Sequence, residues 1–320
     1  MDATTRAPVA EGTHHLGIDL GGTNLKWTVV EQRRRAWTVV DRAQVPTPAT
    51  AGPDGVMARL TALALEAQAR WPSITTVGVG VPGLYDPATG AARFLVNLPG
   101  DWAGRPVASE VVAAVERPVR LINDARAFGL AELRLGAGRG ARAMVGLTLG
   151  TGVGGVIAID GRIHLGHDGT GGELGHQTID PDGPRCGCGN DGCLEAFVRA
   201  DRFAEACGTS TVEAAVVAAR AGDPVATTGI QRMGRYLGIG IANMVTVVTP
   251  DRVVVGGGIA AAADLLFGPI RDELRRRVHT TQLDEVELVV AELGPWAGAI
   301  GAAVHGSGAD DDDAAAGAAA

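Results

Sequence analysis

A pattern of strands joined by glycine turns occurs twice in this 320-residue chain, and it restricts the possible folds more than any other feature. Strand-like segments between residues 16 and 45 form an opening meander, with Gly21-Gly22 as the first turn. The pattern restarts with strand-like segments between residues 143 and 159, separated by Gly150-Thr151-Gly152. A third glycine turn, Gly256-Gly257-Gly258, follows another apolar strand. Strands that alternate with helices predict an α/β fold, and the restart predicts two similar halves.

Helical segments lie between these strands. We expect helices at 56–71, 107–115, 125–135, much of 194–248, 259–278 and 297–304, and further strands at 77–81, 119–122, 252–255 and 286–291. The stretch from 164 to 192 is rich in loops. We expect both ends to be disordered, because the C-terminal segment contains four consecutive aspartates followed by alanines and has nothing to bury.

The composition excludes several classes of protein. Hydrophobic residues make up 46% of the chain, which is enough for a full core. A net charge of −8 argues against broad binding of nucleic acid or of an anionic membrane. No apolar run approaches the roughly 18 residues of a membrane helix, and the N-terminus lacks the features of a signal peptide. The expected compartment is therefore the cytoplasm.

Two glycine turns have the features of phosphate-binding sites. In the first turn, Gly21 and Gly22 allow backbone N–H groups to point outward, while Thr23 and Asn24 add side-chain donors. The segment 150–155 repeats this arrangement between two further strands. The segment 150–155 fits neither a nucleotide P-loop nor a dinucleotide fingerprint, since a strand rather than a helix follows it. The alternative for either turn alone is an ordinary glycine hairpin.

Asn123 and Asp124 follow an apolar strand and precede a helix. Ligands of open α/β sheets bind at such carboxyl ends of strands. A carboxylate there could accept a proton from a sugar hydroxyl while Asn123 hydrogen-bonds its neighbour. The alternative is that Asp124 only caps the helix.

A cluster of metal-binding residues follows the pattern H-x9-C-x-C-x4-C. Its members are His176, Cys186, Cys188 and Cys193. Four such ligands within eighteen residues match a closed tetrahedral zinc site, and with every position filled by protein the zinc is expected to be structural. The alternative, free surface thiols beside a chance histidine, is disfavoured because exposed thiols are usually avoided. Glu173 and Glu195 flank the cluster and are candidates for holding a polyhydroxylated ligand.

Taken together, these motifs resemble the ROK family (repressor, open reading frame, kinase) of bacterial sugar kinases and regulators. The resemblance extends from about Leu16 to Val304, and its most specific part runs from Gly171-Gly172-Glu173-Leu174-Gly175-His176 to Cys193-Leu194-Glu195. It implies an actin-like ATPase (ribonuclease H-like) fold with two α/β lobes around a cleft. The implied organisation is a disordered segment 1–13, a small lobe 14–123 joined by a C-terminal helix 296–305, a large lobe 124–295 with a zinc loop 164–195, and a disordered tail 306–320.

The resemblance also implies roles for individual residues. It makes Asp124 the general base. It places nucleotide contacts at Gly21, Gly22, Thr23, Asn24, Thr151, Gly152, Gly257 and Gly258. It places sugar hydroxyls at Gly83, Asn97, Asn123, Asp124, Glu173, His176 and Glu195, with His176 serving also as a zinc ligand.

Three positions depart from the common family pattern. Asn24 stands where many members carry lysine, and Val156 replaces a frequent glycine. Arg126 replaces a frequent asparagine in the N-D-A-N segment, and this substitution bears on which sugar is accepted.

The expected activity is ATP-dependent phosphorylation of the C6 hydroxyl of a hexose, and glucose is the expected sugar. The expected cofactors are Mg²⁺ and structural Zn²⁺. The expected assembly is a homodimer or homotetramer. The alternatives are a kinase for fructose, mannose, allose, N-acetylmannosamine or N-acetylglucosamine, polyphosphate as a partial replacement for ATP, and a sugar-responsive regulator. Regulators of this family resemble the kinases with a helix-turn-helix domain added in front. About fifteen residues precede the first strand here, which are too few for that domain.

Overall fold

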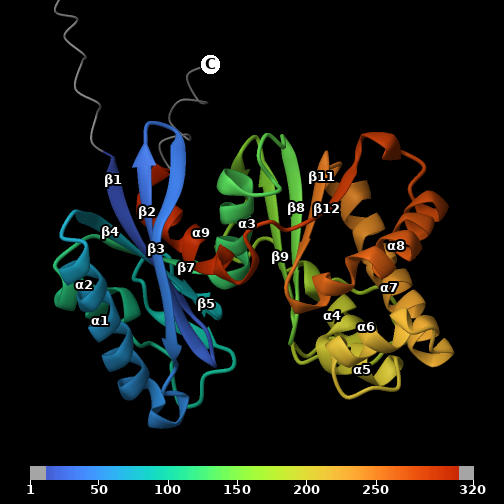
Figure 1. Cartoon of the computed structure of the whole chain (residues 1–320), viewed down its shortest axis with the longest axis horizontal. Coiled ribbons are helices and arrows are strands. Elements are labelled where there is room, and N and C mark those ends of the chain that lie inside the picture. Colours follow the sequence, from blue (N-terminus) through green and yellow to red (C-terminus); the bar gives the residue numbers. More distant parts are fainter. Residues whose placement is uncertain (1–11, 310–320) are drawn as a thin grey trace, which may run out of the picture. The chain divides into compact units, whose positions relative to one another are not determined.

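The computed structural model describes residues 12–309, which divide into two compact units (Figure 1). Unit 1 comprises residues 12–124 and 302–309, and unit 2 comprises residues 125–301. Thr13 and Gly306 were expected to lie in disordered ends, but Thr13 belongs to a strand and Gly306 to a helix. The remaining parts of those two predictions, 1–11 and 310–320, lie outside the described residues.

Unit 1 is built on a five-stranded sheet in the order β3-β2-β1-β4-β7. Its strands are β1 (Thr13–Leu20), β2 (Asn24–Arg33), β3 (Ala36–Pro46), β4 (Ile74–Val81) and β7 (Val119–Asn123). The first three strands pair antiparallel, as the expected meander requires, and β4 and β7 continue the sheet in parallel. A separate hairpin pairs β5 (Gly83–Tyr85) with β6 (Ala92–Leu95).

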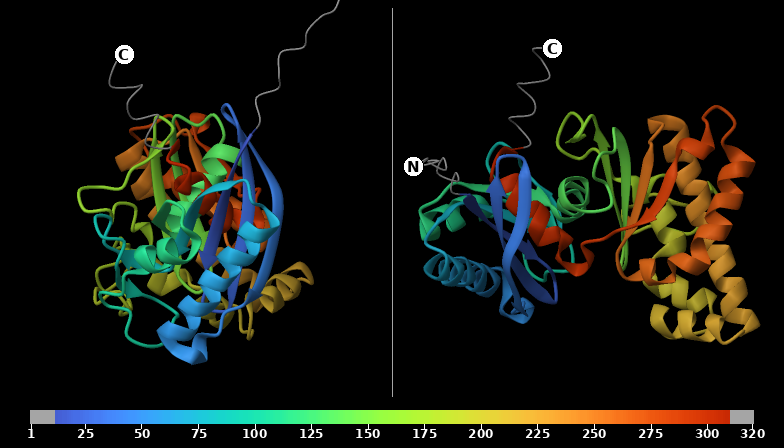
Figure 2. Two further views of the ribbon diagram at one scale, coloured as in Figure 1. Left: turned by 90° about the vertical axis from the view of Figure 1, so that its left-hand side faces the viewer. Right: turned by 45° about the horizontal axis from the view of Figure 1, so that its top comes forward.

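The core of unit 1 lies between this sheet and two helices, α1 (Gly52–Arg70) and α2 (Val107–Val115). Alternate residues of β1 and β4, such as Leu16 and Val79, point into that core and are fully buried. The other sheet face meets the end of α9 (Ala297–Gly306), because the Ala302 carbonyl occupies the space that a Cβ at Gly78 would need. Figure 2 shows α1 and α2 on their face of this sheet.

Unit 2 repeats the same sheet topology, in the order β10-β9-β8-β11-β12. Its strands are β8 (Ala143–Leu149), β9 (Val153–Ile159), β10 (Arg162–Ile163), β11 (Arg252–Gly256) and β12 (Glu287–Val290). The first three again pair antiparallel and the last two pair in parallel. The prediction of two similar α/β halves is therefore confirmed at the level of strand order.

Helices cover both faces of the second sheet. One face packs against the helices of the largest core: α4 (Leu194–Val198), α5 (Ala200–Ala206), α6 (Val212–Arg220), α7 (Pro224–Val248) and α8 (Ala263–Arg277). The other face packs against α3 (Asp124–Leu135), whose Phe128 ring lies 3.5 Å from where a Cβ on Gly146 would be. Asp124 itself belongs to unit 1.

Several elements differ from the sequence predictions for local reasons. Helix α1 begins at Gly52 rather than at residue 56, because Pro53 suits the first turn of a helix. The helix expected over 259–278 is divided into a 3₁₀ turn, Gly258–Ala262, and α8. Arg199 separates α4 from α5 with an extended backbone, an interruption that carries no glycine or proline signal. The short strands β5 and β6 were not predicted, because runs of three and four residues show little periodicity.

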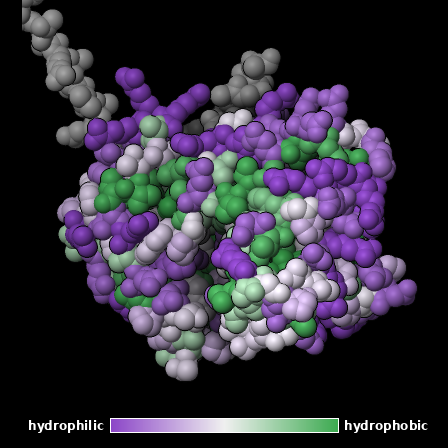
Figure 3. Space-filling view, turned by 45° about the vertical axis from the view of Figure 1, so that its right-hand side comes forward, coloured by the Kyte–Doolittle hydropathy of each residue, from purple (hydrophilic) through white to green (hydrophobic). Residues whose placement is uncertain are grey.

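None of the helices within residues 12–309 combines the length and the apolar character needed to cross a membrane. Figure 3 shows hydrophilic residues interspersed with groups of hydrophobic ones over the face that it presents.

Glu132 is a fully buried carboxylate that joins α3 to the segment after β12. Its Oε2 accepts hydrogen bonds from the backbone N–H groups of Ala137 (2.8 Å) and Glu292 (3.1 Å), and its Oε1 accepts one from Leu293 (2.9 Å). These bonds satisfy donors on loops that no regular secondary structure pairs.

Replacing Glu132 with alanine is expected to lower the free energy of unfolding by about 3 kcal/mol or more, because buried N–H groups would lose their acceptor. Urea denaturation measures the change. The control is Glu205→Ala, which removes an exposed ion pair with Arg202 and should cost less than about 1 kcal/mol. Equal midpoints for the two variants would contradict a structural role for Glu132.

Candidate active site and metal centre

The first glycine turn, between β1 and β2, is held in place by backbone and side-chain hydrogen bonds. The Gly21 N–H donates to the Asn24 carbonyl at 3.1 Å, which closes the turn on itself. Thr47, just after β3, donates its hydroxyl to the Gly21 carbonyl at 2.6 Å and its N–H to the Thr23 carbonyl at 2.9 Å. Thr47 was not predicted as part of the site, because its partners Gly21 and Thr23 lie more than twenty residues away in the sequence. Hydrogen bonds within the turn and from the end of β3 therefore hold it in one conformation.

Asp19 and Lys26 face each other across β1 and β2, directly beside this turn. Burial raises the pKa of the Asp19 carboxyl, and the positive charge of Lys26 acts in the opposite direction and lowers it. Lys26 is the only lysine of the chain. Asp19 was not among the predicted site residues, although it begins the glycine-turn motif, so a carboxylate next to that turn is an addition from the structure.

Three of the predicted sugar-site residues meet at the carboxyl end of β7. The Asn123 side-chain amide donates to the Gly83 carbonyl at 3.1 Å and to Asp124 Oδ1 at 3.0 Å. Asp124 is the first residue of α3, and the hydrogen bond from Asn123 orients its carboxylate. A carboxylate fixed in this way can accept a proton from a hydroxyl placed against it.

Asn97, another predicted sugar contact, lies against the first glycine turn. It has a left-handed backbone, with φ of 61°, and a Cβ on Gly22 would lie 2.6 Å from its carbonyl oxygen. This close approach explains why position 22 is glycine. In unit 1, the predicted phosphate-binding turn at Gly22 therefore lies next to Asn97, a predicted sugar contact.

The second glycine turn, in unit 2, is tied to Glu195. The Gly150 N–H donates to the Gly152 carbonyl at 2.9 Å, and the Val153 N–H donates to Glu195 Oε2 at 2.8 Å. A Cβ on Gly152 would lie 2.5 Å from the same Glu195 oxygen. One oxygen of this predicted sugar contact is therefore engaged by the turn.

A cavity of about 630 Å³ opens beside this turn, within unit 2. Its lining includes Gly150, Thr151, Arg199, Asp201, Thr211 and Gly258. Gly257, in the third glycine turn, has φ of 84° and packs so tightly on Leu149 that no Cβ would fit. The volume is typical of pockets for small molecules and cofactors. The charged lining residues Arg199 and Asp201 were not predicted.

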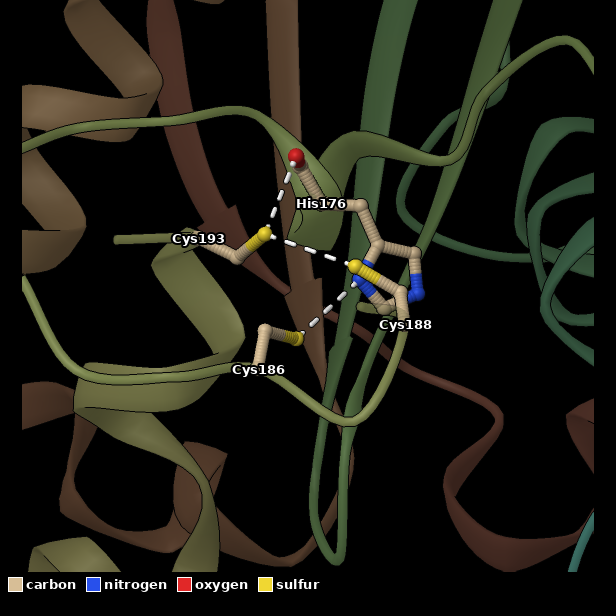
Figure 4. Close-up of side chains that lie close together, drawn as sticks. All are labelled: His176, Cys186, Cys188 and Cys193. Atoms are coloured by element: carbon tan, nitrogen blue, oxygen red, sulfur yellow. Dashed lines mark hydrogen bonds between the residues drawn. The ribbon is translucent and has the colours of Figure 1, made fainter. Parts of the chain in front are cut away.

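The predicted metal ligands converge on one point (Figure 4). The ligand atoms of His176, Cys186, Cys188 and Cys193 all lie within 4.8 Å of one another. Cys186 Sγ is 3.6 Å from His176 Nδ1, and Cys188 Sγ is 3.6 Å from Cys193 Sγ. Ligands of a tetrahedral zinc ion lie about 3.5–3.8 Å from one another, given Zn–S and Zn–N bonds of about 2.3 and 2.0–2.1 Å. The residues present therefore fit zinc.

The chemistry of the three thiols agrees with this geometry. Burial raises the pKa of the Cys186 thiol to about 12 and also raises the pKa of Cys193, whereas the backbone N–H of Asn190 lowers the pKa of Cys188. Buried thiolates need a compensating cation, which a bound metal supplies. Cys207 lies outside the cluster and is buried in the core, as expected.

Glu173 stands between this metal cluster and α3. Its Oε2 is 3.9 Å from His176 Nε2, and its Oε1 is 3.1 Å from the Arg126 guanidinium. Arg126 is buried and also donates to the Gly171 carbonyl. Arg126, which departs from the family pattern, therefore contacts Glu173, a predicted sugar contact.

Comparison with known proteins supplies the family. The ROK family matches residues 15–306. The glucokinase of Thermotoga maritima is 35% identical over 308 residues, covering 90% of this chain and 95% of that protein. The ROK hexokinase of Thermus thermophilus superposes with a TM-score of 0.83 at 34% identity, covering 94% of this chain and 100% of the other.

A third relative was solved with ligands. The ROK family glucokinase of Streptomyces griseus, in complex with glucose and AMPPNP, superposes with a TM-score of 0.78 at 29% identity, over 92% of this chain and 99% of that one. The two similar α/β sheets agree with these neighbours, and the predicted actin-like fold class is confirmed. On the match over residues 15–306 and these full-length similarities, the chain belongs to the ROK family.

Proposed function

We propose that this protein is a glucokinase, which transfers the γ-phosphoryl group of ATP to the C6 hydroxyl of glucose. The observation that carries the proposal is the orientation of the Asp124 carboxylate by Asn123 at the carboxyl end of β7. The similarity to glucokinases over most of the chain supports the same activity, as does the Streptomyces griseus relative in complex with glucose and AMPPNP.

In this mechanism Asp124 is the general base. Asn123 holds Asp124 Oδ1, and the carboxylate accepts the proton of the C6 hydroxyl as that oxygen attacks the γ-phosphorus. Phosphoryl transfer needs little covalent help from the protein, so positioning and charge stabilisation provide most of the catalysis. The residues that we expect to contact the sugar are Gly83, Asn97, Asn123, Glu173, His176 and Glu195.

The two glycine turns would hold the phosphates of ATP through their N–H groups and through Thr23 and Thr151. Asn24 begins β2 at the end of the first turn, and Gly257 and Gly258 stand beside the cavity of unit 2, which would receive the nucleoside. The Asp19 carboxylate would hold Mg²⁺ bound with ATP, and this ion would neutralise charge on the transferred group. Zinc held by His176 and the three cysteines would keep the loop of Glu173 and Glu195 rigid.

A coupled assay of the purified protein tests this function. It measures ADP formation with glucose, fructose, mannose, allose, N-acetylmannosamine and N-acetylglucosamine, with ATP or polyphosphate as donor. ATP-dependent turnover of glucose is expected, and an acylated hexosamine as the best substrate would disprove the glucokinase assignment while leaving a sugar kinase. A cytoplasmic location and a homodimer or homotetramer stay predictions.

Glu173→Ala is expected to affect the use of sugar much more than the use of ATP. A site that hydrogen-bonds particular hydroxyls rejects analogues that lack them. For the wild-type protein, kcat/KM for glucose should therefore exceed kcat/KM for mannose or N-acetylglucosamine by at least about tenfold, or 1.4 kcal/mol. The variant should raise the KM for glucose and leave the KM for ATP nearly unchanged. Equal increases in both constants would argue against Glu173 as a sugar contact.

A further inference from the structure

Arg126 is a buried cation that hydrogen-bonds to a loop distant from it in the sequence. It lies in the first turn of α3, two residues after Asp124, and its side chain is 3% exposed. A guanidinium keeps its charge when buried, so the cost of removing it from water must be offset by well-placed acceptors.

Two such acceptors, the Gly171 carbonyl and a carboxylate oxygen of Glu173, lie on one loop of unit 2. Arg126 Nε and Nη2 both donate to the Gly171 carbonyl, at 3.0 and 2.9 Å, and Nη2 also donates to Glu173 Oε1 at 3.1 Å. These partners lie 45 and 47 residues further along the chain. One side chain therefore fixes both the backbone and the carboxylate of this loop relative to α3.

Close packing also holds the backbone of the loop that carries Glu173, independently of Arg126. A Cβ on Gly155 of β9 would lie 2.5 Å from the Gly172 carbonyl, and a Cβ on Gly171 would lie 2.7 Å from the Gly166 nitrogen. Gly172 itself has φ of 95°, which few other residues tolerate. The side chain of Glu173 is 45% exposed, so its rotamer is the part of the loop that Arg126 most directly controls.

The two carboxylate oxygens of Glu173 have different surroundings. Oε1 is held by Arg126, whereas Oε2 is 3.9 Å from His176 Nε2, too far for a hydrogen bond. An ionised carboxylate only accepts hydrogen bonds, and here Oε2 is left to accept one from a ligand hydroxyl.

We propose that Arg126 is a positioning residue, which orients Glu173 toward one sugar hydroxyl and thereby sets the discrimination between hexoses. The proposal rests on the proposed function, since it concerns how the hexose is held. Without Arg126, Glu173 would be free to sample several rotamers, and ordering it again would cost binding energy.

The first test compares Arg126→Met, which removes the charge at similar length, with Arg126→Lys. Arg126→Met is expected to raise the KM for glucose about tenfold, with smaller changes in kcat and in the KM for ATP, and to reduce the preference for glucose over mannose. Arg126→Lys should recover part of the loss, because an ammonium can pair with Glu173 but cannot reproduce the planar fork. A fall in kcat alone, with the KM for glucose unchanged, would overturn the proposal.

The second test repeats the substitution in the Glu173→Ala background. If Arg126 acts through Glu173, Arg126→Met should change the KM for glucose by less than about twofold there, whereas independent effects would multiply. Multiplication of the two effects would overturn the proposal. Should Arg126→Met fail to fold, Arg126→Lys carries the same test, since its cost must also vanish in that background.

A matched control comes from Arg252, which makes the same kinds of contact elsewhere in unit 2. It donates to the Ala137 and Arg139 carbonyls and pairs with Glu287. Arg252→Met should lower the unfolding midpoint without altering the KM for glucose. A change in that KM equal to the change caused by Arg126→Met would overturn the proposal.

Calorimetric titration with glucose separates the proposed kinase activity from the proposed role of Arg126. A wild-type protein that binds glucose without phosphorylating it contradicts the kinase activity, and the role of Arg126 is then tested by the affinity for glucose alone.

Discussion

Asp124→Asn is expected to lower kcat by about 10²–10⁴-fold while glucose binding is largely retained. The amide oxygen can still accept the hydrogen bond that Asn123 donates to Asp124 Oδ1, so the local geometry should survive. The amide cannot accept the proton of the C6 hydroxyl, so only the chemical step should suffer. Steady-state kinetics measures kcat, and calorimetry measures the affinity for glucose.

The matched control for this variant is Asp272→Asn. Asp272 is an exposed residue of α8 that pairs with Arg275, and its replacement should leave kcat within about twofold of the wild type because exposed pairs contribute little. If Asp124→Asn retained more than a tenth of the wild-type kcat, Asp124 would not be the base. Loss of glucose affinity together with kcat would instead indicate a role in binding.

Cys188→Ala is expected to abolish zinc binding and to weaken the use of sugar. Elemental analysis of the wild type should find about one zinc per chain, and the variant should contain almost none, since a structural site needs all four ligands. Cys188 is the exposed member of the cluster, so its replacement disturbs packing least. The loop that carries Glu173 and ends at Glu195 should then exchange its amide hydrogens faster, and the KM for glucose should rise by about tenfold or more.

Cys207→Ala is the matched control for the zinc prediction. Cys207 is a buried cysteine of the same unit that lies outside the metal cluster, so this variant should keep one zinc per chain and the wild-type KM for glucose. Its melting temperature should fall modestly because a small core side chain is shortened. A zinc-free wild-type protein with full activity would contradict the proposed structural role of the metal.

Local sequence determined much of the architecture. The strand segments, the glycine turns and most helices could be predicted because each depends on periodicity or on breakers within about twenty residues. The metal cluster could be predicted for the same reason, since its ligands fall between His176 and Cys193. The repeated strand order also agrees with the restarted meander. Breaks without a local signal, such as the one at Arg199, were missed.

Only the tertiary structure decided which distant side chains meet. Thr47 anchors the turn at Gly21, Asn123 reaches Gly83, and Glu132 binds the backbone of residues 292 and 293. Arg126 was recognisable in the sequence as a departure from the family, but its direction was unknown until the fold placed Glu173 beside it. A sequence pattern indicates which face of a strand or helix a residue occupies. The partner of that residue depends on strand order and on how loops cross the sheet, and these are set by packing over the whole chain.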